Sequence, residues 1–160
     1  MSYGCLCLSF ESSRSEPGLS RFGLSYTSFL FSSLKVTSLN SAGEFSLGIS
    51  LSVTNTGDVA GSEVVQVYIT LPAGCPTTPE YQLRTFRKVR DLKSGDTREV
   101  HVKLDKYAVS YWDVNGVEGR KTGVWRVKEG IYRIAIGSSS IDHRLNSEFE
   151  VKDGFVWEGL

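Results

Sequence analysis

Short stretches in which apolar and polar residues alternate follow one another along most of the chain. Residues 46–54 carry Leu, Ile, Leu and Val at the odd positions and mainly glycine and serine at the even ones. This two-residue period is typical of a strand with one buried face. The pattern predicts further strands over 63–70, 82–89, 99–104, 123–127, 130–136 and 144–151, and a short strand or helical turn over 107–112, with the register of 82–89 left uncertain.

Turn-forming residues separate these stretches. Asn-Thr-Gly-Asp at 55–58, Lys-Ser-Gly-Asp at 93–96 and Asn-Gly at 115–116 are typical turn sequences. Within the first of them, Gly57 is expected to adopt a positive φ. Pro72, Pro76 and Pro79 predict a long loop or crossover over residues 71–80.

Seven or eight short strands without an amphipathic helix longer than two turns predict an all-β, immunoglobulin-like antiparallel sandwich. The inter-sheet cysteine pair of antibody domains is missing, so the fibronectin type III-like version is favoured. We expect a serine-rich irregular leader over 1–21, the sandwich over 22–151 and a tail over 152–160. The expected core consists of Leu47, Ile49, Leu51, Val53, Val65, Val67, Ile69, Val100, Val102, Tyr132, Ile134 and Ile136.

Composition and charge exclude several partners. Apolar residues make up 40% of the 160 residues, and 18 Lys and Arg balance 18 Asp and Glu. Nucleic acid and an anionic membrane surface both require a basic surplus, so neither is expected as a partner. No apolar run is long enough to span a bilayer, and the first residues lack the basic region of a secretion signal.

The cysteines suggest neither a disulfide framework nor a metal site. Cys5 and Cys7 are too close for an easy mutual bridge, and Cys75 would be left over. Cys5-Leu6-Cys7 has no second pair with which to hold zinc. Residues 113–116 resemble the opening of a calcium loop but lack its later ligands. We expect no cofactor and no metal.

No arrangement of side chains in the sequence predicts catalysis. Asp113, beside a turn, is the best acid, and a turn-capping role is favoured for it. His101 lies on an expected solvent face, and His143 in a polar loop near Ser138–Ser140, which is a poor basis for a catalytic triad. The remaining acids are expected at the solvated surface: Asp58, Glu63, Asp91, Asp96, Glu99, Glu118, Glu129 and Asp142.

The large aromatic residues have two interpretations. They could form a platform on which sugar rings stack, or they could pack between or at the edges of sheets, as is more common in a sandwich of this size. Packing is favoured for Trp112 and Trp125. The full set considered is Trp112, Trp125, Trp157, Tyr68, Tyr81 and Tyr111.

Several segments, in the correct order, resemble one known domain: the C-terminal fibronectin type III-like domain of family 3 glycoside hydrolases, and in particular of fungal β-glucosidases. The resemblance covers about residues 22–151 and departs from the family at Thr85, where a glycine is usual. The similar segments are 22–29, 53–68, 94–96, Trp112-Asp113, Trp125 with 130–132, and 137–139, together with Pro79, Leu83, Phe86 and Val89.

The resemblance implies that this domain has a non-catalytic role. In these enzymes the nucleophilic Asp and the acid/base Glu lie on upstream domains, so no catalytic residue carries over to this chain. The implied partner is the catalytic body of a glycoside hydrolase, in cis. A free-standing module that binds polysaccharide or another protein is the alternative, and an active hydrolase is the weakest hypothesis.

Overall fold

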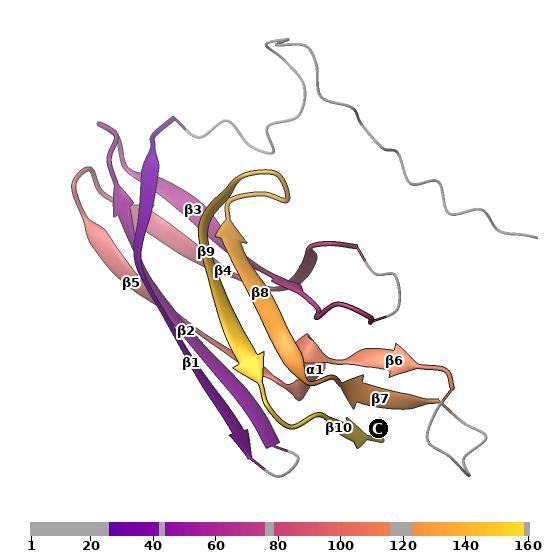
Figure 1. Ribbon diagram of the computed structural model, residues 1–160. Helices are drawn as coiled ribbons and strands as arrows, with labels where there is room; N and C mark the ends of the chain where they lie inside the picture. Colours follow the sequence, from indigo (N-terminus) through magenta and orange to yellow (C-terminus); the bar gives the residue numbers. More distant parts are fainter. Residues whose placement is uncertain (1–25, 42–43, 76–78, 116–122, 159–160) are drawn as a thin grey trace, which may run out of the picture.

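The computed structural model describes residues 26–41, 44–75, 79–115 and 123–158, which form ten β-strands and one four-residue helix (Figure 1). Every strand pair in these residues is antiparallel. The predicted fold class, an all-β antiparallel sandwich, is confirmed. Residues 1–21, the expected leader, lie outside the described residues. In the described part, no helix is both long and apolar enough to cross a membrane.

Two sheets form the sandwich. Sheet A has the strand order β1-β2-β5, with β1 at Phe29–Ser41, β2 at Glu44–Asn55 and β5 at Thr97–Asp105. Sheet B has the order β4-β3-β8-β9, with β4 at Gln82–Leu92, β3 at Gly61–Thr70, β8 at Gly130–Gly137 and β9 at His143–Val151. Along one side of the sandwich β1 contacts β9, and along the other β4 contacts β5.

The predicted core is confirmed. All its members are buried except Val102, which is only partly buried but packs against the core. Val102 lies on β5, which pairs with β2 alone. An edge strand has a neighbour on one side only, so its inward side chains are less completely covered.

Strand β1 is not evident from the alternating pattern, and the structure shows why. Phe29 and Phe31 are buried, but the pairing with β2 shifts between Ser32 and Lys35. At this β-bulge Ser33 has a φ of 56°. A bulge adds one residue to one strand of a pair and so interrupts the two-residue period.

A third, small sheet accompanies the sandwich, which the prediction of a simple two-layer sandwich did not include. Sheet C has the order β10-β7-β6, with β6 at Tyr111–Asp113, β7 at Val124–Val127 and β10 at Phe155–Trp157. Helix α1, Lys106–Val109, precedes β6, so segment 107–112 contains both a helical turn and a strand. Strand β10 lies in the segment expected to be a tail. With β1 and β10, which lie outside the segments predicted as strands, the described residues contain ten strands instead of the expected seven or eight.

Asn55, expected as a turn residue, is a fully buried side chain that joins three segments. Its Oδ1 accepts hydrogen bonds from Thr27 Oγ1 at 2.6 Å and from the Gly57 amide at 3.0 Å. Its Nδ2 donates to the carbonyl oxygens of Val59 and Leu92, each at 2.8 Å. The amide group is thereby satisfied away from water, as a buried polar group must be.

The expected positive φ at Gly57 is wrong. Among the described residues, only Gly74, Gly95 and Gly130 are glycines with positive φ. Gly57 is required for a different reason: a Cβ there would lie 2.2 Å from Thr27 Oγ1 and 2.9 Å from the Ser28 backbone nitrogen. The close approach of the chain before β1 leaves no room for a side chain.

Tyr132, near the start of β8, is a core residue whose hydroxyl is bonded to the backbone. Its hydroxyl donates to the Lys128 carbonyl at 2.8 Å and lies 3.3 Å from the Val109 carbonyl. Its ring is fully buried and stacks on Phe149, and burial raises the pKa of the Tyr132 hydroxyl. A buried tyrosine bonded to the backbone four residues upstream is similar to the tyrosine corner of immunoglobulin-like sandwiches.

The core position of Val67 leads to the first testable prediction. Val67 is completely buried, between Thr85 of β4 and Ile136 of β8. Because Val67→Ala removes two buried methyl groups, we expect it to lower the free energy of unfolding by about 2–3 kcal/mol. Urea denaturation measures this change, with Val114→Ala at an exposed position as the control. An unchanged midpoint would refute the burial of Val67.

Candidate functional site

The acidic and imidazole side chains considered for chemistry do not converge on one place. His101 is exposed and lies 3.7 Å from Glu99. Glu63, Asp113 and Asp142 are partly buried and pair with arginines, which corrects the expectation of a solvated position for Glu63 and Asp142. No group of three His, Cys, Asp or Glu in the described residues could hold a metal ion. Asp58, Asp91, Asp96, Glu99 and Glu129 are exposed, while Glu118 lies outside the described residues.

Asp113 makes the turn contact expected of it. One carboxylate oxygen accepts a hydrogen bond from the Asn115 backbone amide at 3.0 Å. The other accepts from Arg126 Nε at 2.8 Å. Both oxygens are therefore engaged in fixing the end of β6 against β7. The calcium-like pattern that starts here runs into Gly116, which lies outside the described residues.

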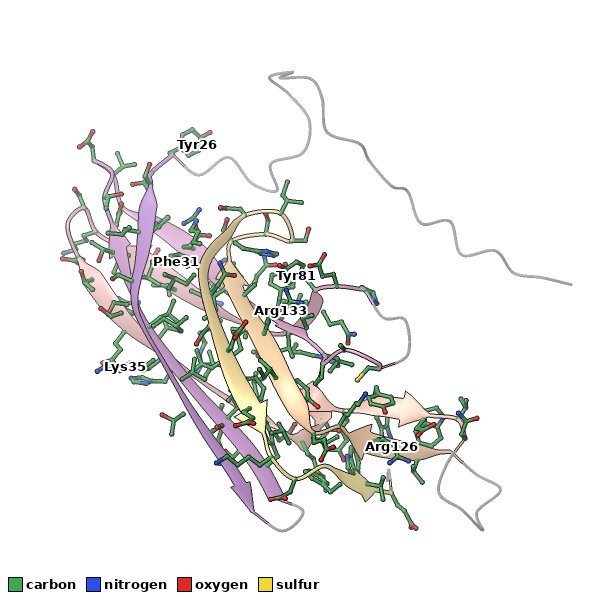
Figure 2. The ribbon with its side chains drawn as sticks, viewed as in Figure 1. Tyr26, Phe31, Lys35, Tyr81, Arg126 and Arg133 are labelled. Atoms are coloured by element: carbon green, nitrogen blue, oxygen red, sulfur yellow. The ribbon has the colours of Figure 1, made fainter. Side chains whose placement is uncertain are left out.

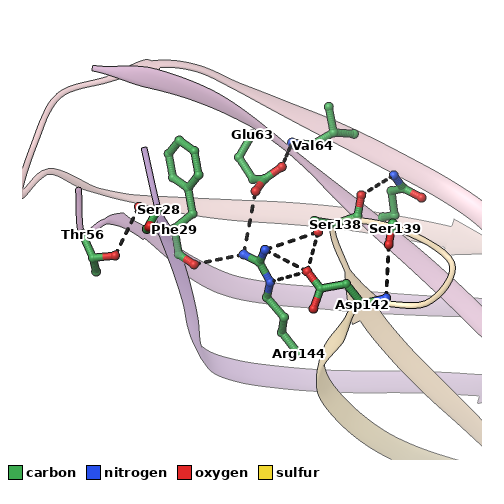
Figure 3. A network of polar contacts seen from close by, with 10 residues as sticks. Ser28, Phe29, Thr56, Glu63, Val64, Ser138, Ser139, Asp142 and Arg144 are labelled. Carbon is green, nitrogen blue, oxygen red and sulfur yellow. Dashed lines mark hydrogen bonds and ion pairs between the residues drawn. The ribbon is translucent and has the colours of Figure 1, made fainter. Parts of the chain in front are cut away.

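Arg144, at the start of β9, is the centre of the polar network in Figure 3. Its guanidinium donates to the Phe29 carbonyl at 2.9 Å and contacts the Asp142 carboxylate at 2.9 Å. It also lies 3.7 Å from the Glu63 carboxylate and over the Phe31 ring. One side chain thus connects β1, β3 and β9 at one end of the sandwich.

The turn that joins β8 to β9 does not assemble a catalytic triad. Ser138 Oγ donates to the Asp142 carboxylate at 2.6 Å, and Ser139 Oγ accepts from the Asp142 amide at 3.1 Å. His143, expected in a polar loop, begins β9, and its ring lies against the rings of Tyr68 and Tyr81. A serine bonded directly to a carboxylate is held in the turn and is not activated by an imidazole.

The contribution of this turn to the stability of the fold is expected to depend on pH through Asp142. Hydrogen bonds from Ser138 and Arg144 hold the pKa of the Asp142 carboxyl below its usual value. The folded chain therefore binds this proton less readily than the unfolded chain, so the stabilisation is present above about pH 4 and is lost as pH falls through the folded pKa. We expect Asp142→Asn to lower stability at pH 7 but to have little effect at pH 2–3. Thermal unfolding of the wild type and of Asp142→Asn between pH 2 and pH 7 tests this prediction. A difference in stability between the two proteins that stays constant over this range would contradict it.

Three tryptophans form a ladder across sheet C. Trp112 of β6 is directly opposite Trp125 of β7, and Trp125 is opposite Trp157 of β10. Trp125 and Trp157 stack at 5.6 Å between ring centroids, and Trp112 meets Trp125 at a steep angle at 5.5 Å. At the far end, Lys106 Nζ lies 4.5 Å from the centre of the Trp157 ring and Tyr107 packs against its edge or face.

The ladder does not have the geometry of a sugar-stacking platform. Such a platform needs ring faces open to solvent, whereas Trp125 and Trp157 cover one another. Trp112 is the most exposed of the three at 46%, but its ring lies so close to Gly123 that a Cβ there would be 2.7 Å from it. The tryptophans pack with one another at the edge of the fold, as favoured for Trp112 and Trp125.

The tyrosines of the same set lie elsewhere. Tyr68 is buried on sheet B, and its ring packs against His143. Tyr81, at the end of the loop before β4 and labelled in Figure 2, packs against the same imidazole. Tyr111 packs against the core, and burial raises the pKa of its hydroxyl. The six aromatic residues are therefore divided among three places, and only the tryptophans meet.

Strand β4 carries a surface that the sequence pattern does not reveal. Val89 is buried as its position suggests, but Leu83 is 50% and Phe86 is 66% exposed. The pairing of β4 with β3 shifts beside Val67, so Leu83 is opposite Tyr68 and Phe86 is opposite Gln66, and neither shares the inward face of Val65 and Val67. The three-residue spacing from Leu83 to Phe86 to Val89 is the signal that could have indicated a break in alternation.

Between the open edges of β4 and β5 lies a hollow of about 320 Å³. Arg84 from β4 and Lys103 from β5 both line it. Arg84 donates to the Gln82 side chain, but its Nε is buried and has no hydrogen-bond partner among the described residues. Burial lowers the pKa of the Arg84 guanidinium, which means that its charge is incompletely solvated there. The remaining lining comes from Leu83, Thr85, Leu104, Asp105, Tyr107 and Ala108.

Comparisons with known proteins agree with the fold. Residues 63–140 match the family model of the fibronectin type III-like domain. The chain is 38% identical over 149 residues to a probable β-glucosidase L of Aspergillus fumigatus, covering 84% of this chain and 19% of that protein. It is 38% identical over 140 residues to a probable β-glucosidase H of Aspergillus clavatus, covering 86% of this chain and 16% of that protein.

Solved structures show the same relationship. The β-glucosidase of Kluyveromyces marxianus superimposes with a TM-score of 0.73 at 38% identity, over 87% of this chain and 16% of the enzyme. β-Glucosidase 3B of Thermotoga neapolitana, in complex with glucose, gives a TM-score of 0.72 at 33% identity, over 86% of this chain and 18% of the enzyme. The chain therefore spans less than a fifth of the length of these relatives.

Proposed function

This chain carries a fibronectin type III-like domain homologous to the C-terminal region of family 3 β-glucosidases, and on this premise we propose that it is a non-catalytic accessory module. Its role is to pack on the catalytic domains of a β-glucosidase-like glycoside hydrolase and to stabilise them. The partner is the catalytic body, in cis in a parent protein.

The observation that carries the proposal is the share of the relatives that the chain represents. It corresponds to 16–19% of each β-glucosidase described above, so most of each enzyme has no counterpart in this chain. The acids support the same conclusion. Glycoside hydrolysis by the usual mechanism needs two carboxyl groups on either side of a scissile bond, whereas Asp113 and Asp142 are each held by an arginine and a turn.

The stabilising role can be tested with an enzyme that lacks its own module. The Kluyveromyces marxianus β-glucosidase is truncated to remove the region that this chain matches, and the full chain is added in trans or fused in its place. We expect the thermal inactivation temperature of the truncated enzyme to rise by several degrees, because a partner that binds only the folded state stabilises it. An unchanged inactivation temperature in both formats would contradict the accessory role.

The non-catalytic part of the proposal has its own test. The purified chain alone is expected to release no nitrophenol from an aryl β-glucoside between pH 4 and 7. The control is Asp113→Ala, because the sequence indicates Asp113 as the best candidate acid, although Arg126 and the turn hold its carboxylate. Turnover that survives purification and disappears in Asp113→Ala would show that the chain is an enzyme.

A further inference from the structure

We propose that the module docks through the edge formed by β4 and β5, and that an acidic side chain of the catalytic body enters the hollow beside Arg84. We call this surface the β4–β5 edge and define it by Leu83, Arg84, Phe86, Lys103 and Tyr107. The inference rests on the proposed function and specifies the surface through which it acts.

The first observation is the apolar side chains that this edge leaves uncovered. Phe86 is 66% exposed, Leu83 is 50% exposed and Tyr107 is 44% exposed. Leu83 and Tyr107 line the hollow from its two sides, and Phe86 lies three residues along β4 from Leu83. Large side chains that the fold itself does not bury, gathered beside a concave surface, are the usual anchors of a protein interface.

The second observation is the incompletely satisfied arginine inside the hollow. Arg84 Nε has no hydrogen-bond partner in the described part of the chain, although the atom is buried. A buried donor without a partner is costly, and a carboxylate is the group that best matches a guanidinium. Lys103 adds a second positive charge to the same hollow, and Asp105, whose carboxylate accepts a hydrogen bond from the Tyr107 amide, is the one acid among its lining residues. Because Nε itself is buried, a carboxylate from a partner would pair with the part of Arg84 that lines the hollow.

The charges around the hollow also favour an acidic partner. Strand β4 carries Arg84, Arg87, Lys88 and Arg90 against a single acid, Asp91. A neighbouring hollow of about 390 Å³ is lined by Lys35, Arg87, His101 and Lys103 and by no carboxylate. This edge is basic although the chain as a whole has no net charge. A second copy of the chain would bring like charges together, so an acidic partner surface fits and self-association does not.

Two other surfaces lack this combination. The tryptophan ladder of sheet C is largely covered by its own members. The outward face of β2 carries Gly48, Ser50, Ser52 and Thr54, which offer no large apolar anchor. The β4–β5 edge alone, among these three, joins apolar anchors to a concave charged site.

The test measures binding of the full chain to the truncated Kluyveromyces marxianus β-glucosidase by titration calorimetry. We expect Phe86→Ser and Arg84→Gln each to weaken binding by about tenfold or more. Arg84→Lys keeps the charge but loses Nε and the planar fork, so it should recover only part of the affinity. The matched control is Ile131→Ser on β8, which is 59% exposed and outside the edge, and it should change the affinity less than about twofold.

The possible outcomes separate the two proposals. If the wild-type chain does not bind, the accessory role fails and the docking surface fails with it. If the wild-type chain binds and the edge variants bind equally well, or if Ile131→Ser weakens binding as much as they do, only the docking surface is overturned. Urea unfolding of each variant shows that it is folded. If Arg84→Gln unfolds, Phe86→Ser still tests the docking surface, because Phe86 is mostly exposed and its replacement should leave the fold intact. Weaker binding at higher salt is expected for the wild type.

Discussion

Replacing Asn55 with leucine is expected to lower the free energy of unfolding by about 3 kcal/mol. The substitution removes a buried amide group whose hydrogen bonds join three segments of the chain. The carbonyl oxygens of Val59 and Leu92 would lose the donor that Nδ2 supplies, and the Gly57 amide would lose its acceptor. Leucine has nearly the same size, so the loss reports hydrogen bonding more than a cavity. Urea denaturation of the full chain measures it.

Two further variants separate the parts of this effect. Asn55→Asp retains an acceptor for the Gly57 amide but places a carboxylate against two carbonyl oxygens, so it should be as destabilising as leucine at pH 7. Asn146→Ala on β9 changes the same residue type at an exposed position and should alter stability by less than about 0.5 kcal/mol. If Asn55→Leu were as mild as Asn146→Ala, the buried network would not contribute to stability.

Gly137→Ala is expected to destabilise the chain by about 3 kcal/mol, at the upper end of overpacking effects. A Cβ at Gly137 would lie 1.9 Å from the Asp142 carbonyl oxygen. That oxygen accepts the Ser138 amide hydrogen bond at 3.2 Å, which closes the turn between β8 and β9. The neighbour is backbone and not a flexible side chain, so the turn has to open to admit the methyl group.

Gly48→Ala is the matched control for this prediction. Gly48 is also a strand glycine, but a Cβ there would meet only the Thr37 carbonyl oxygen, at 3.8 Å. Alanine restricts the unfolded chain more than glycine does, so this variant should be neutral or slightly stabilising. Thermal unfolding of the two variants in parallel gives the comparison. Equal loss of stability in both would show that close approach at Gly137 is not the cause.

Most of the sandwich was predictable because a strand with one buried face displays its period locally. Leu47 to Val53 and Val65 to Ile69 identify their own inward faces from adjacent residues alone. The same local information fails at β1, where the bulge at Ser33 changes the phase between Phe31 and Leu34. A bulge depends on the partner strand, which the local pattern does not contain.

The candidate site was less predictable than the fold. The turn contact of Asp113 involves Asn115, two residues away, and could be anticipated from turn chemistry. The exposure of Phe86 and Leu83 could not, since an apolar residue in a strand normally suggests burial. The hollow beside Arg84 requires β5 to lie next to β4, and no pattern within either strand specifies that neighbour.

The sequence by itself determined the class of fold, the inward faces of the main strands and the resemblance to one family of modules. The tertiary structure decided what individual polar residues do. Asn55 has the sequence context of a turn residue, yet it binds groups from Thr27 to Leu92, and Arg144 reaches the Phe29 carbonyl 115 residues away. The physical reason is that alternation and turn chemistry act between neighbours in the chain, whereas buried hydrogen bonds and surface hollows are made between segments that only folding brings together.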